Sequence, residues 1–416
     1  MMTTELPQVQ IYENTACTAC GCVCDDIRVT ISDNRVIETA HTCEIGKEWF
    51  LSQTHTNPAV AAFEGKEVLL ETAIARASEL LKNAKYPVIY GLSRSTTEGQ
   101  RAAVHLAEQI RATIDTSAAT GHAPSLMALQ EVGESTCTLG EVKQRADLIV
   151  FWGCDPVTTH PRHLERYCPP RAGRKIITVD VAETPTAKVS DHYFSVSEGN
   201  DWQLLTELRA LRKQPNWEGA SITARHLHKL FHGSRFGIVF FGGGLVKQPF
   251  AHRTVEVLLR YTMELNDQRR FYARRLRRMG DVAGADSVLT WQTGFPFGVN
   301  FASGSPRYNP GEFTVPEMLA RREPDLCLLI GSETIRDFSS AALSHLRNIP
   351  TITLDSPGTQ SPVPPTIRFH TAVYGIHKQG TAYRMDEVPI PLRKIADSAY
   401  PSDYNVLRRI LEYLQK

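Results

Sequence analysis

The feature that most constrains this chain is a cluster of five cysteines within residues 17–43, because its other four cysteines are scattered. Four of the five stand in the string CTACGCVC at residues 17–24, and the fifth is Cys43. Taken as ligands, Cys17, Cys20, Cys24 and Cys43 have the spacing C-x2-C-x3-C-x18-C. Thiolates on one tight loop, with a fourth from a later turn, suit the corners of a [4Fe–4S] cluster.

The spacing leaves other interpretations open. Zinc also takes four thiolates in structural sites, a disulfide framework is a simpler reading, and redox use or chance clustering of the cysteines also stays open. Cys22 fits no ligand pattern and is interpreted as a spare thiol. The long gap before Cys43 leaves room for a hairpin over residues 27–37 that turns at residues 32–34, because Asp and Asn accept turn geometry.

Composition sets broad limits on the class of protein. The 416 residues are 42% hydrophobic and 22% charged, with a net charge of +1, which predicts several domains with a sizeable core. This charge balance gives no sign of a nucleic-acid or membrane partner. No apolar run approaches the roughly 18 residues of a membrane span, and residues 1–11 lack the apolar core of a signal peptide. A thiol-rich chain of this kind is expected to be cytoplasmic, where cysteines stay reduced.

Beyond the cysteines, strands that end in small residues alternate with helical patterns. This alternation predicts an α/β fold with mainly parallel sheets. The expected strands are 87–91, 146–153, 175–180, 192–196, 236–241, 286–291, 325–331 and 350–355. The expected helices are 69–82, 98–114, 201–212, 252–266 and a last one from 403.

The same pattern predicts the domain organisation. A polar stretch at residues 214–220 is interpreted as a junction, and the similarity of 147–155 to 325–333 indicates two related α/β subdomains. We therefore expect four parts. They are an iron–sulfur domain (1–65), two α/β subdomains (66–215 and 216–360) and a C-terminal segment that packs back on the core (361–416).

Several strand ends are candidate cofactor-binding positions. Gly153, Asp180 and Gly243 each follow or end a predicted strand, where parallel sheets commonly bind ligands. Asp180 could meet a ribose hydroxyl or simply cap a turn, and the residues alone slightly favour the turn. The Gly/Ser/Thr loop at 91–96 could cradle a phosphate, although a plain connection is the simpler reading.

Two further segments stand out. Residues 269–279 carry six arginines, which usually form a solvated face but could also meet an anionic cofactor or a partner subunit. Residues 292–312 form a long loop rich in Gly, Pro and aromatic residues. A loop of this length in a compact domain is usually functional or disordered, and its aromatic residues argue against disorder.

Taken together, the motifs resemble one family over residues 15–395. The cysteine segment resembles the iron–sulfur domain of the molybdopterin oxidoreductases and, more narrowly, the B subunit of formylmethanofuran dehydrogenase. The strings that carry this resemblance are CxxCGxxCDDI (17–27), GHAPSLMALQ (121–130), TLGEVKQRAD (138–147), WG (152–153) with HPR (160–162), TWQTG (290–294), PRYNPGE (306–312) and GTAYRMD (380–386).

The resemblance implies a molybdopterin-oxidoreductase-like fold with the iron–sulfur domain first. In the redox members of this family, the B subunit holds a [4Fe–4S] cluster, here placed on Cys17, Cys20, Cys24 and Cys43. It also holds tungsten or molybdenum on a bis-pterin guanine dinucleotide, through a cysteine or selenocysteine just before a histidine. In this chain His122 is retained and Arg307 is the candidate active-site arginine, but the metal-ligand position is Gly121.

Glycine cannot replace a thiolate ligand. The chain therefore resembles the B subunit of the formyltransferase/hydrolase complex, a non-redox variant that releases formate in tetrahydromethanopterin-linked one-carbon metabolism. The expected partners are an amidohydrolase-like A subunit, a formyltransferase subunit, a C subunit and a methanofuran-type carrier. The bis-pterin metal is then expected to be absent, the cluster serves as a structural clamp, and catalysis by this subunit itself is doubtful.

Other readings stay open at this point. One is the active B subunit of a tungsten or molybdenum formylmethanofuran dehydrogenase, in which hydroxide or water replaces the thiolate. Another is a zinc-stabilised interaction module without cofactor. His122 and His160 are equally well read as packed, hydrogen-bonded histidines once the metal is doubted.

Overall fold

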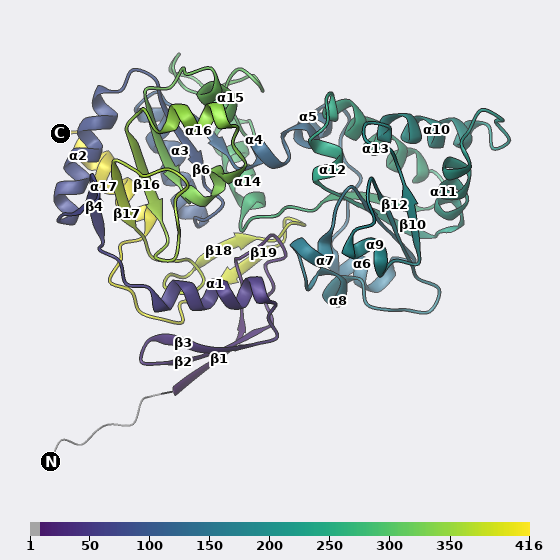
Figure 1. The fold of residues 1–416 in the computed structure, drawn as a ribbon, viewed down its shortest axis with the longest axis horizontal. Coiled ribbons are helices and arrows are strands. Elements are labelled where there is room, and N and C mark those ends of the chain that lie inside the picture. The colour runs from purple at the N-terminus through teal and green to yellow at the C-terminus, as the bar shows by residue number, and fades with distance from the viewer. Residues whose placement is uncertain (1–8) are drawn as a thin grey trace. The chain divides into compact units, whose positions relative to one another are not determined.

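The computed structural model describes residues 9–416, which divide into two compact units (Figure 1). Unit 1 contains residues 9–120 and 279–416, and unit 2 contains residues 121–278. This division differs from the expected boundaries, because the polar stretch at 214–220 only links two packed helices of unit 2, α10 (Asp201–Lys213) and α11 (Ile222–Gly233). Residues 1–8, the polar start of the chain, lie outside the described residues.

The main sheet of unit 1 has the strand order β14-β13-β7-β6-β15-β16-β17-β4-β5. Its centre, from β7 to β17, is parallel, and antiparallel strands close both ends. The central strands are β6 (Pro87–Gly91), β7 (Thr113–Thr116), β15 (Leu326–Ile330), β16 (Thr351–Asp355) and β17 (Ile367–His370). The outer strands are β4 (Ala61–Phe63), β5 (Lys66–Glu67), β13 (Val299–Asn300) and β14 (Arg307–Tyr308).

Helices cover both faces of this sheet. Alternate residues of a strand point to opposite faces, so Ile89 and Leu328 join one core and Tyr90 and Leu329 join the other. The first core contains α2 (Leu70–Asn83), α3 (Thr97–Gln109), α14 (Val282–Thr293) and α17 (Asp403–Leu414). The second contains α15 (Val315–Ala320), α16 (Ser340–Leu346) and the 3-10 turn η1 (Ser332–Asp337).

A small three-stranded sheet precedes the main sheet in unit 1. It has the order β1-β2-β3, with β1 (Val9–Thr15), β2 (Ile27–Ser32) and β3 (Arg35–Ala40), and is followed by α1 (Glu44–His55). The expected hairpin is confirmed as β2–β3, and its turn uses positive φ angles at Asp33 and Asn34. A second hairpin, β18 (Gly380–Tyr383) with β19 (Pro389–Leu392), packs with Ala16 and Val23 in a small core.

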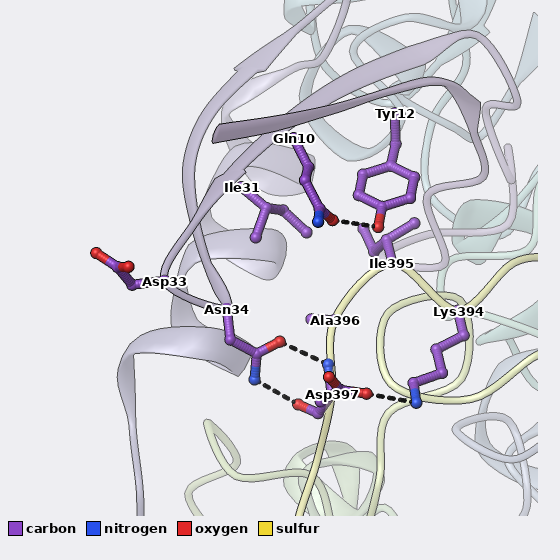
Figure 2. Close-up of a pocket in the computed structure, with 9 residues that line it drawn as sticks. All are labelled: Gln10, Tyr12, Ile31, Asp33, Asn34, Lys394, Ile395, Ala396 and Asp397. Atoms are coloured by element: carbon purple, nitrogen blue, oxygen red, sulfur yellow. Dashed lines mark hydrogen bonds and ion pairs between the residues drawn. The ribbon is translucent and has the colours of Figure 1, made fainter. Parts of the chain in front are cut away.

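A polar cavity of about 540 Å³ lies between the β1–β3 sheet and residues 394–397 (Figure 2). Most of its polar groups are already paired. Asn34 exchanges two hydrogen bonds with the backbone of Asp397, at 2.9 and 2.6 Å, and Lys394 forms an ion pair with the Asp397 carboxylate at 2.6 Å. Tyr12 donates to Gln10 at 2.8 Å. These contacts fix the C-terminal segment against the small sheet.

Unit 2 is built on a fully parallel sheet with the order β10-β9-β8-β11-β12. Its strands are β8 (Leu148–Trp152), β9 (Lys175–Asp180), β10 (His192–Ser195), β11 (Phe236–Phe241) and β12 (Arg270–Arg275). One face packs on α5 (Ala123–Val132), α10, α11 and α13 (Ala251–Leu265). The shorter helices are α4 (Ala118–Gly121), α6 (Leu139–Arg145), α7 (Pro156–Thr159), α8 (His163–Tyr167), α9 (Pro185–Lys188) and α12 (Gly243–Val246).

The strands β8 and β15, whose sequences are similar, both begin just after an aspartate that contacts a neighbouring strand. The carboxylate of Asp147, before β8, accepts hydrogen bonds from the backbone N–H groups of Arg235 and Phe236, each at 3.0 Å. Asp325, before β15, accepts from the N–H groups of Lys85 and Tyr86 at 2.7 and 2.9 Å. Each aspartate therefore fastens the start of its strand to the neighbouring strand, β11 or β6.

Two predictions of local structure are wrong. The expected helix at 98–114 ends at Gln109, and the strand β7 follows it after a tight turn in which Arg111 has a φ of 55°. Residues 286–291, expected to be a strand, lie in the helix α14. The carboxylate of Asp281 caps that helix by accepting a hydrogen bond from the N–H of Gly284 at 2.9 Å. Because this capping residue precedes the apolar run 286–291, the run by itself does not indicate a helix. Among residues 9–416, no helix is long and apolar enough to cross a membrane.

Candidate functional site

Four of the five clustered cysteines lie on a compact turn of unit 1, residues 17–24, and the fifth, Cys43, is the N-cap residue of α1. The backbone N–H of Cys17 donates to the carbonyl of Cys24 at 2.8 Å, and that of Val23 donates to Cys20 at 3.2 Å. Val23 adopts a positive φ of 36°, which closes the turn. All nine cysteines are free, so no disulfide forms among the described residues.

Hydrogen bonds link the thiols of this loop. The side chain of Cys22 is the main cause that lowers the pKa of Cys20, since it donates a hydrogen bond to that sulfur. The pKa of Cys22 is raised well above its usual value by its bonds to Cys20 and Cys24. Burial raises the pKa of Cys17 strongly and that of the half-buried Cys43. Cys22 therefore supports its neighbours, a role that its spacing did not predict.

The loop has features that suit a [4Fe–4S] cluster. Backbone N–H groups donate to two of the four predicted ligands, Ala19 to Cys17 and Cys22 to Cys20. Such N–H···S bonds are among the contacts that stabilise and tune cluster thiolates. In the part of the chain that the structure describes, no group of three or more His, Cys, Asp or Glu side chains is arranged to hold a single metal ion.

An arginine that the motifs did not single out anchors this loop. Arg94, which follows β6, donates to the carbonyls of Thr18 and Ala19 at 2.8 and 3.2 Å. Its Nε forms an ion pair with Glu333 at 2.7 Å, and its guanidinium lies 4.5 Å from the ring centroid of Trp49. The positive charge of Arg94 also contributes to lowering the pKa of Cys20. Its contacts span distant parts of the chain, so no local motif reveals them.

Gly121 and His122, at the start of unit 2, form the second candidate site. His122 is buried, and its Nε2 lies 3.2 Å from the carbonyl oxygen of Leu276, whereas its Nδ1 is buried without a hydrogen-bond partner. Burial, followed by the charges of Arg277 and Arg275, holds the pKa of His122 well below its usual value. His122 is therefore neutral at physiological pH.

The arginine segment 269–279 lies beside these histidines. The Nε2 of His160 lies 2.7 Å from the carbonyl oxygen of Arg277, and burial lowers the pKa of His160 to about 4. Arg274, Arg275 and Arg277 are at most 4% exposed. The solvated-face prediction is therefore wrong for these three, because β12 and the residues after it run through the interior. Arg275 forms a buried ion pair with Glu134 at 3.0 Å.

The structure brings the three strand-end candidates to one edge of the unit 2 sheet. Gly153, Asp180 and Gly243 follow or end β8, β9 and β11, whose carboxyl ends lie side by side. Gly153 has a φ of 58°, and a Cβ there would lie 2.9 Å from the Cα of Gly244, so close packing requires glycine. A Cβ at Gly243 would meet only the end of the Lys247 side chain, at 4.0 Å.

Asp180 behaves as the turn interpretation predicts. Its carboxylate accepts a hydrogen bond from the N–H of Val181 at 2.7 Å, while partial burial raises its pKa. Arg307 belongs to unit 1, where it is exposed and its guanidinium lies 5.0 Å from the ring centroid of Phe313. Arg307 and His122 therefore fall in different units.

The residues at positions 121 and 122 do not supply a thiolate for tungsten or molybdenum. A Cβ at Gly121 would meet no atom within 4 Å, and its φ is not positive. The backbone therefore has room for a side chain that the sequence does not provide. Position 121 therefore does not fit the soft-thiolate coordination that tungsten or molybdenum takes.

The fold, with its two α/β units and the cysteine loop, is similar to those of known proteins. No family model matches the sequence. Among solved structures, the fold is similar to acetylene hydratase from Pelobacter acetylenicus (TM-score 0.68, 12% identity, 97% of this chain and 69% of that one). It is also similar to a chain of the formyltransferase/hydrolase complex FhcABCD from Methylorubrum extorquens in complex with methylofuran (TM-score 0.71, 23% identity, 85% and 98%). These likenesses concern the fold alone, and they agree with the mixed α/β architecture and parallel sheets of this chain.

Sequence relatives narrow the comparison to one family. The chain is 36% identical to the B subunit of tungsten-containing formylmethanofuran dehydrogenase 2 from Methanocaldococcus jannaschii, over 98% of each chain. It is 34% identical to the protein of the same name from Methanococcus maripaludis, over 97% of this chain and 99% of that one. The B subunit of the formyltransferase/hydrolase complex Fhc from Methylorubrum extorquens is 25% identical over 63% of this chain and 72% of its own length. The chain belongs to the family of formylmethanofuran dehydrogenase B subunits.

Proposed function

We propose that this chain is the B subunit of a formyltransferase/hydrolase-type complex in one-carbon metabolism, where it acts as a non-redox scaffold. The observation that carries this proposal is Gly121. In the redox design, the thiolate at this position bonds directly to tungsten or molybdenum, and glycine leaves that bond unmade.

Packing does not account for the glycine. Position 121 has no positive φ, and an added Cβ would meet nothing within 4 Å. A cysteine would therefore fit the backbone without strain. The missing thiolate thus reflects a chemistry that the subunit no longer needs, which supports the scaffold role.

The cysteine loop supports a structural cluster in this scaffold. We infer that Cys17, Cys20, Cys24 and Cys43 would hold a [4Fe–4S] cluster, whose chemistry when bound is one-electron transfer. Backbone N–H groups point to the sulfurs of Cys17 and Cys20, and Arg94, paired with Glu333, holds the loop against the main sheet. Loss of a buried metal site commonly unfolds its loop, so the cluster serves as a clamp.

Partners and carrier follow by analogy with the relatives. The FhcABCD complex, which is similar in fold, contains methylofuran, and we propose that this chain likewise assembles with A, C and formyltransferase subunits that handle a methanofuran-type carrier. Identity over the whole chain is higher to the tungsten-containing subunits than to the Fhc relative. An active tungsten or molybdenum dehydrogenase subunit is therefore the second candidate, which the same experiment tests.

The test is elemental analysis of the complex, purified anaerobically from its native host. Iron, zinc, tungsten and molybdenum are counted per copy of this chain. Four irons without tungsten or molybdenum are expected, since four thiols and no residue-121 thiolate are present. Stoichiometric tungsten or molybdenum would overturn the scaffold proposal. Zinc in place of iron would overturn the cluster assignment but leave the scaffold role standing.

A matched pair of variants sharpens the test. Gly121→Cys restores the thiol, and Gly121→Ala adds the same Cβ without sulfur. In a host that makes the tungsten cofactor, metal that appears only in Gly121→Cys would show that the thiolate alone was missing. Tungsten in the wild-type and Gly121→Ala complexes would contradict the proposal.

A further inference from the structure

The amino end of the unit 2 sheet carries a pocket that the proposed function does not use. The pocket has a volume of about 470 Å³ and lies where β8 and β9 begin. We call it the amino-edge pocket and define it by Asp147, Lys175, His192, His226 and Lys229. It lies at the opposite ends of the strands from Gly153, Asp180 and Gly243.

Positive charge gathers at this end of the sheet. Four of the five strands begin at or beside a basic residue: Lys175 for β9, His192 for β10, Arg235 for β11 and Arg270 for β12. Asp147 and Asp191 also lie at this end, but their carboxylates accept hydrogen bonds from backbone N–H groups, and the pocket itself is lined by two lysines and one aspartate. Concentrated charge of one sign in a concave site attracts ligands of the other sign.

The two lysines of the pocket are available to a ligand. Within residues 9–416, neither Lys175 nor Lys229 forms an ion pair. The acidic residue of the pocket is already occupied, because Asp147 accepts from the N–H groups of Arg235 and Phe236 and lies 3.6 Å from the Arg235 guanidinium. The lining therefore keeps two uncompensated ammonium groups.

Two imidazole rings of the pocket lining meet edge to face. The ring centroids of His192 and His226 lie 5.6 Å apart at 63°, and His226 packs edge-on against Phe194 at 5.0 Å. These contacts hold the rings in place. The pocket also has open space beside Gly173 and Gly233, because a Cβ added to either would meet nothing within 4 Å. The wall thus offers ring N–H donors, flat surfaces and open space beside the lysines.

We propose that the amino-edge pocket binds the phosphoryl group of a small phosphorylated molecule. Two ammonium groups match the charge of a phosphate dianion, and imidazole N–H groups can donate to its remaining oxygens. The volume lies in the range of small-molecule sites and exceeds a bare phosphate, so the rings are placed to contact the group that the phosphate carries. This site is independent of position 121 and of the cysteine loop.

The experiment titrates the purified complex with pyrophosphate and with AMP by isothermal titration calorimetry at low ionic strength. AMP adds a flat ring to a phosphomonoester, so tighter binding of AMP would identify ring contacts. Lys175→Gln/Lys229→Gln is expected to weaken binding by about tenfold or more, because both ammonium groups are lost. The control Lys188→Gln/Lys213→Gln removes the same charge from exposed sites of unit 2 outside the pocket.

The outcomes separate a site from general attraction. Saturable binding that falls only in the pocket variant supports the proposal, and added salt should weaken it. Equal loss in both double variants would show nonspecific attraction and overturn it. Absence of saturable binding of either probe to the wild-type complex would also overturn it. Thermal unfolding of both variants confirms that each remains folded.

Discussion

Arg94 and Glu333 form an ion pair at 2.7 Å that ties the cysteine loop to the main sheet of unit 1. Arg94 follows β6 and Glu333 follows β15, two adjacent parallel strands, and both side chains are only 14% exposed. The Nη1 of Arg94 donates to the carbonyls of Thr18 and Ala19 in the cysteine loop. The pair therefore holds the cysteine loop at the carboxyl ends of β6 and β15, which are far from the cysteines in sequence.

We expect Arg94→Lys to destabilise unit 1 by about 3 kcal/mol, because the ammonium group cannot make the bonds to Glu333, Thr18 and Ala19 together. The variant should also lose bound iron before the rest of the unit unfolds. Urea unfolding and iron content of the purified complex measure the two effects. The control is Arg76→Lys, whose ion pair with Glu79 is exposed and is expected to contribute under about 0.5 kcal/mol. Similar losses in both variants would contradict the anchoring role.

The cysteine loop offers a second comparison. Cys24→Ser removes a predicted cluster ligand, and Cys22→Ser removes the neighbouring thiol that supports Cys20. We expect Cys24→Ser to lose most iron after anaerobic reconstitution and Cys22→Ser to retain about four irons, since Cys22 is not a ligand. Iron analysis and the visible absorption of the complex provide the measurement. Loss of iron in Cys22→Ser but not in Cys24→Ser would reverse the ligand assignment.

Asp281 makes the stability of unit 1 depend on pH. Burial raises its pKa from 3.8 to about 8, although it accepts from the N–H groups of Tyr383 and Gly284 at 2.7 and 2.9 Å. Because the folded pKa lies above the unfolded one, the stabilisation is fully present below about pH 4 and is lost as pH rises through about 8.

The corresponding test compares wild type with Asp281→Asn, which keeps a carbonyl oxygen for the two backbone donors. The wild-type free energy of unfolding should fall with a slope of up to about 1.4 kcal/mol per pH unit in this range from Asp281 alone. The Asn variant should lack that component. Parallel pH profiles for the two proteins would show that Asp281 is ionised throughout.

The buried strands were predictable from sequence because their signal is local. The runs at β6, β8 and β15 are continuous apolar segments, as parallel strands covered on both faces require. The cysteine spacing and the glycine before His122 were equally visible. They predict the ligand positions, and the structure adds that three of the four thiols lie on one loop that Arg94 contacts, while Cys43 lies at the start of α1.

Other features depended on tertiary contacts that no local pattern contains. Arg94 lies 76 residues from Thr18 and 239 from Glu333, so its role emerges only when the strands pair. Arg275 reads as a surface charge until Glu134, 141 residues away, is placed beside it. The apolar run 286–291 in helix α14 is short enough to resemble a strand, and the sequence signal for a helix is the N-cap residue Asp281 that precedes it.

Alanine substitutions at two glycines test whether packing, and not a lost metal ligand, explains the glycine at position 121. Gly121→Ala is expected to leave stability unchanged or raise it by up to about 1 kcal/mol, because position 121 ends α4 and an added Cβ meets no atom. Gly91→Ala should cost more than about 3 kcal/mol, since Gly91 has a φ of 116° and its Cβ would lie 2.2 Å from the carbonyl oxygen of Ile330. Chemical denaturation of both variants measures the difference. A large loss of stability in Gly121→Ala would mean that packing demands the glycine, and the absent thiolate would then no longer argue for a non-redox subunit.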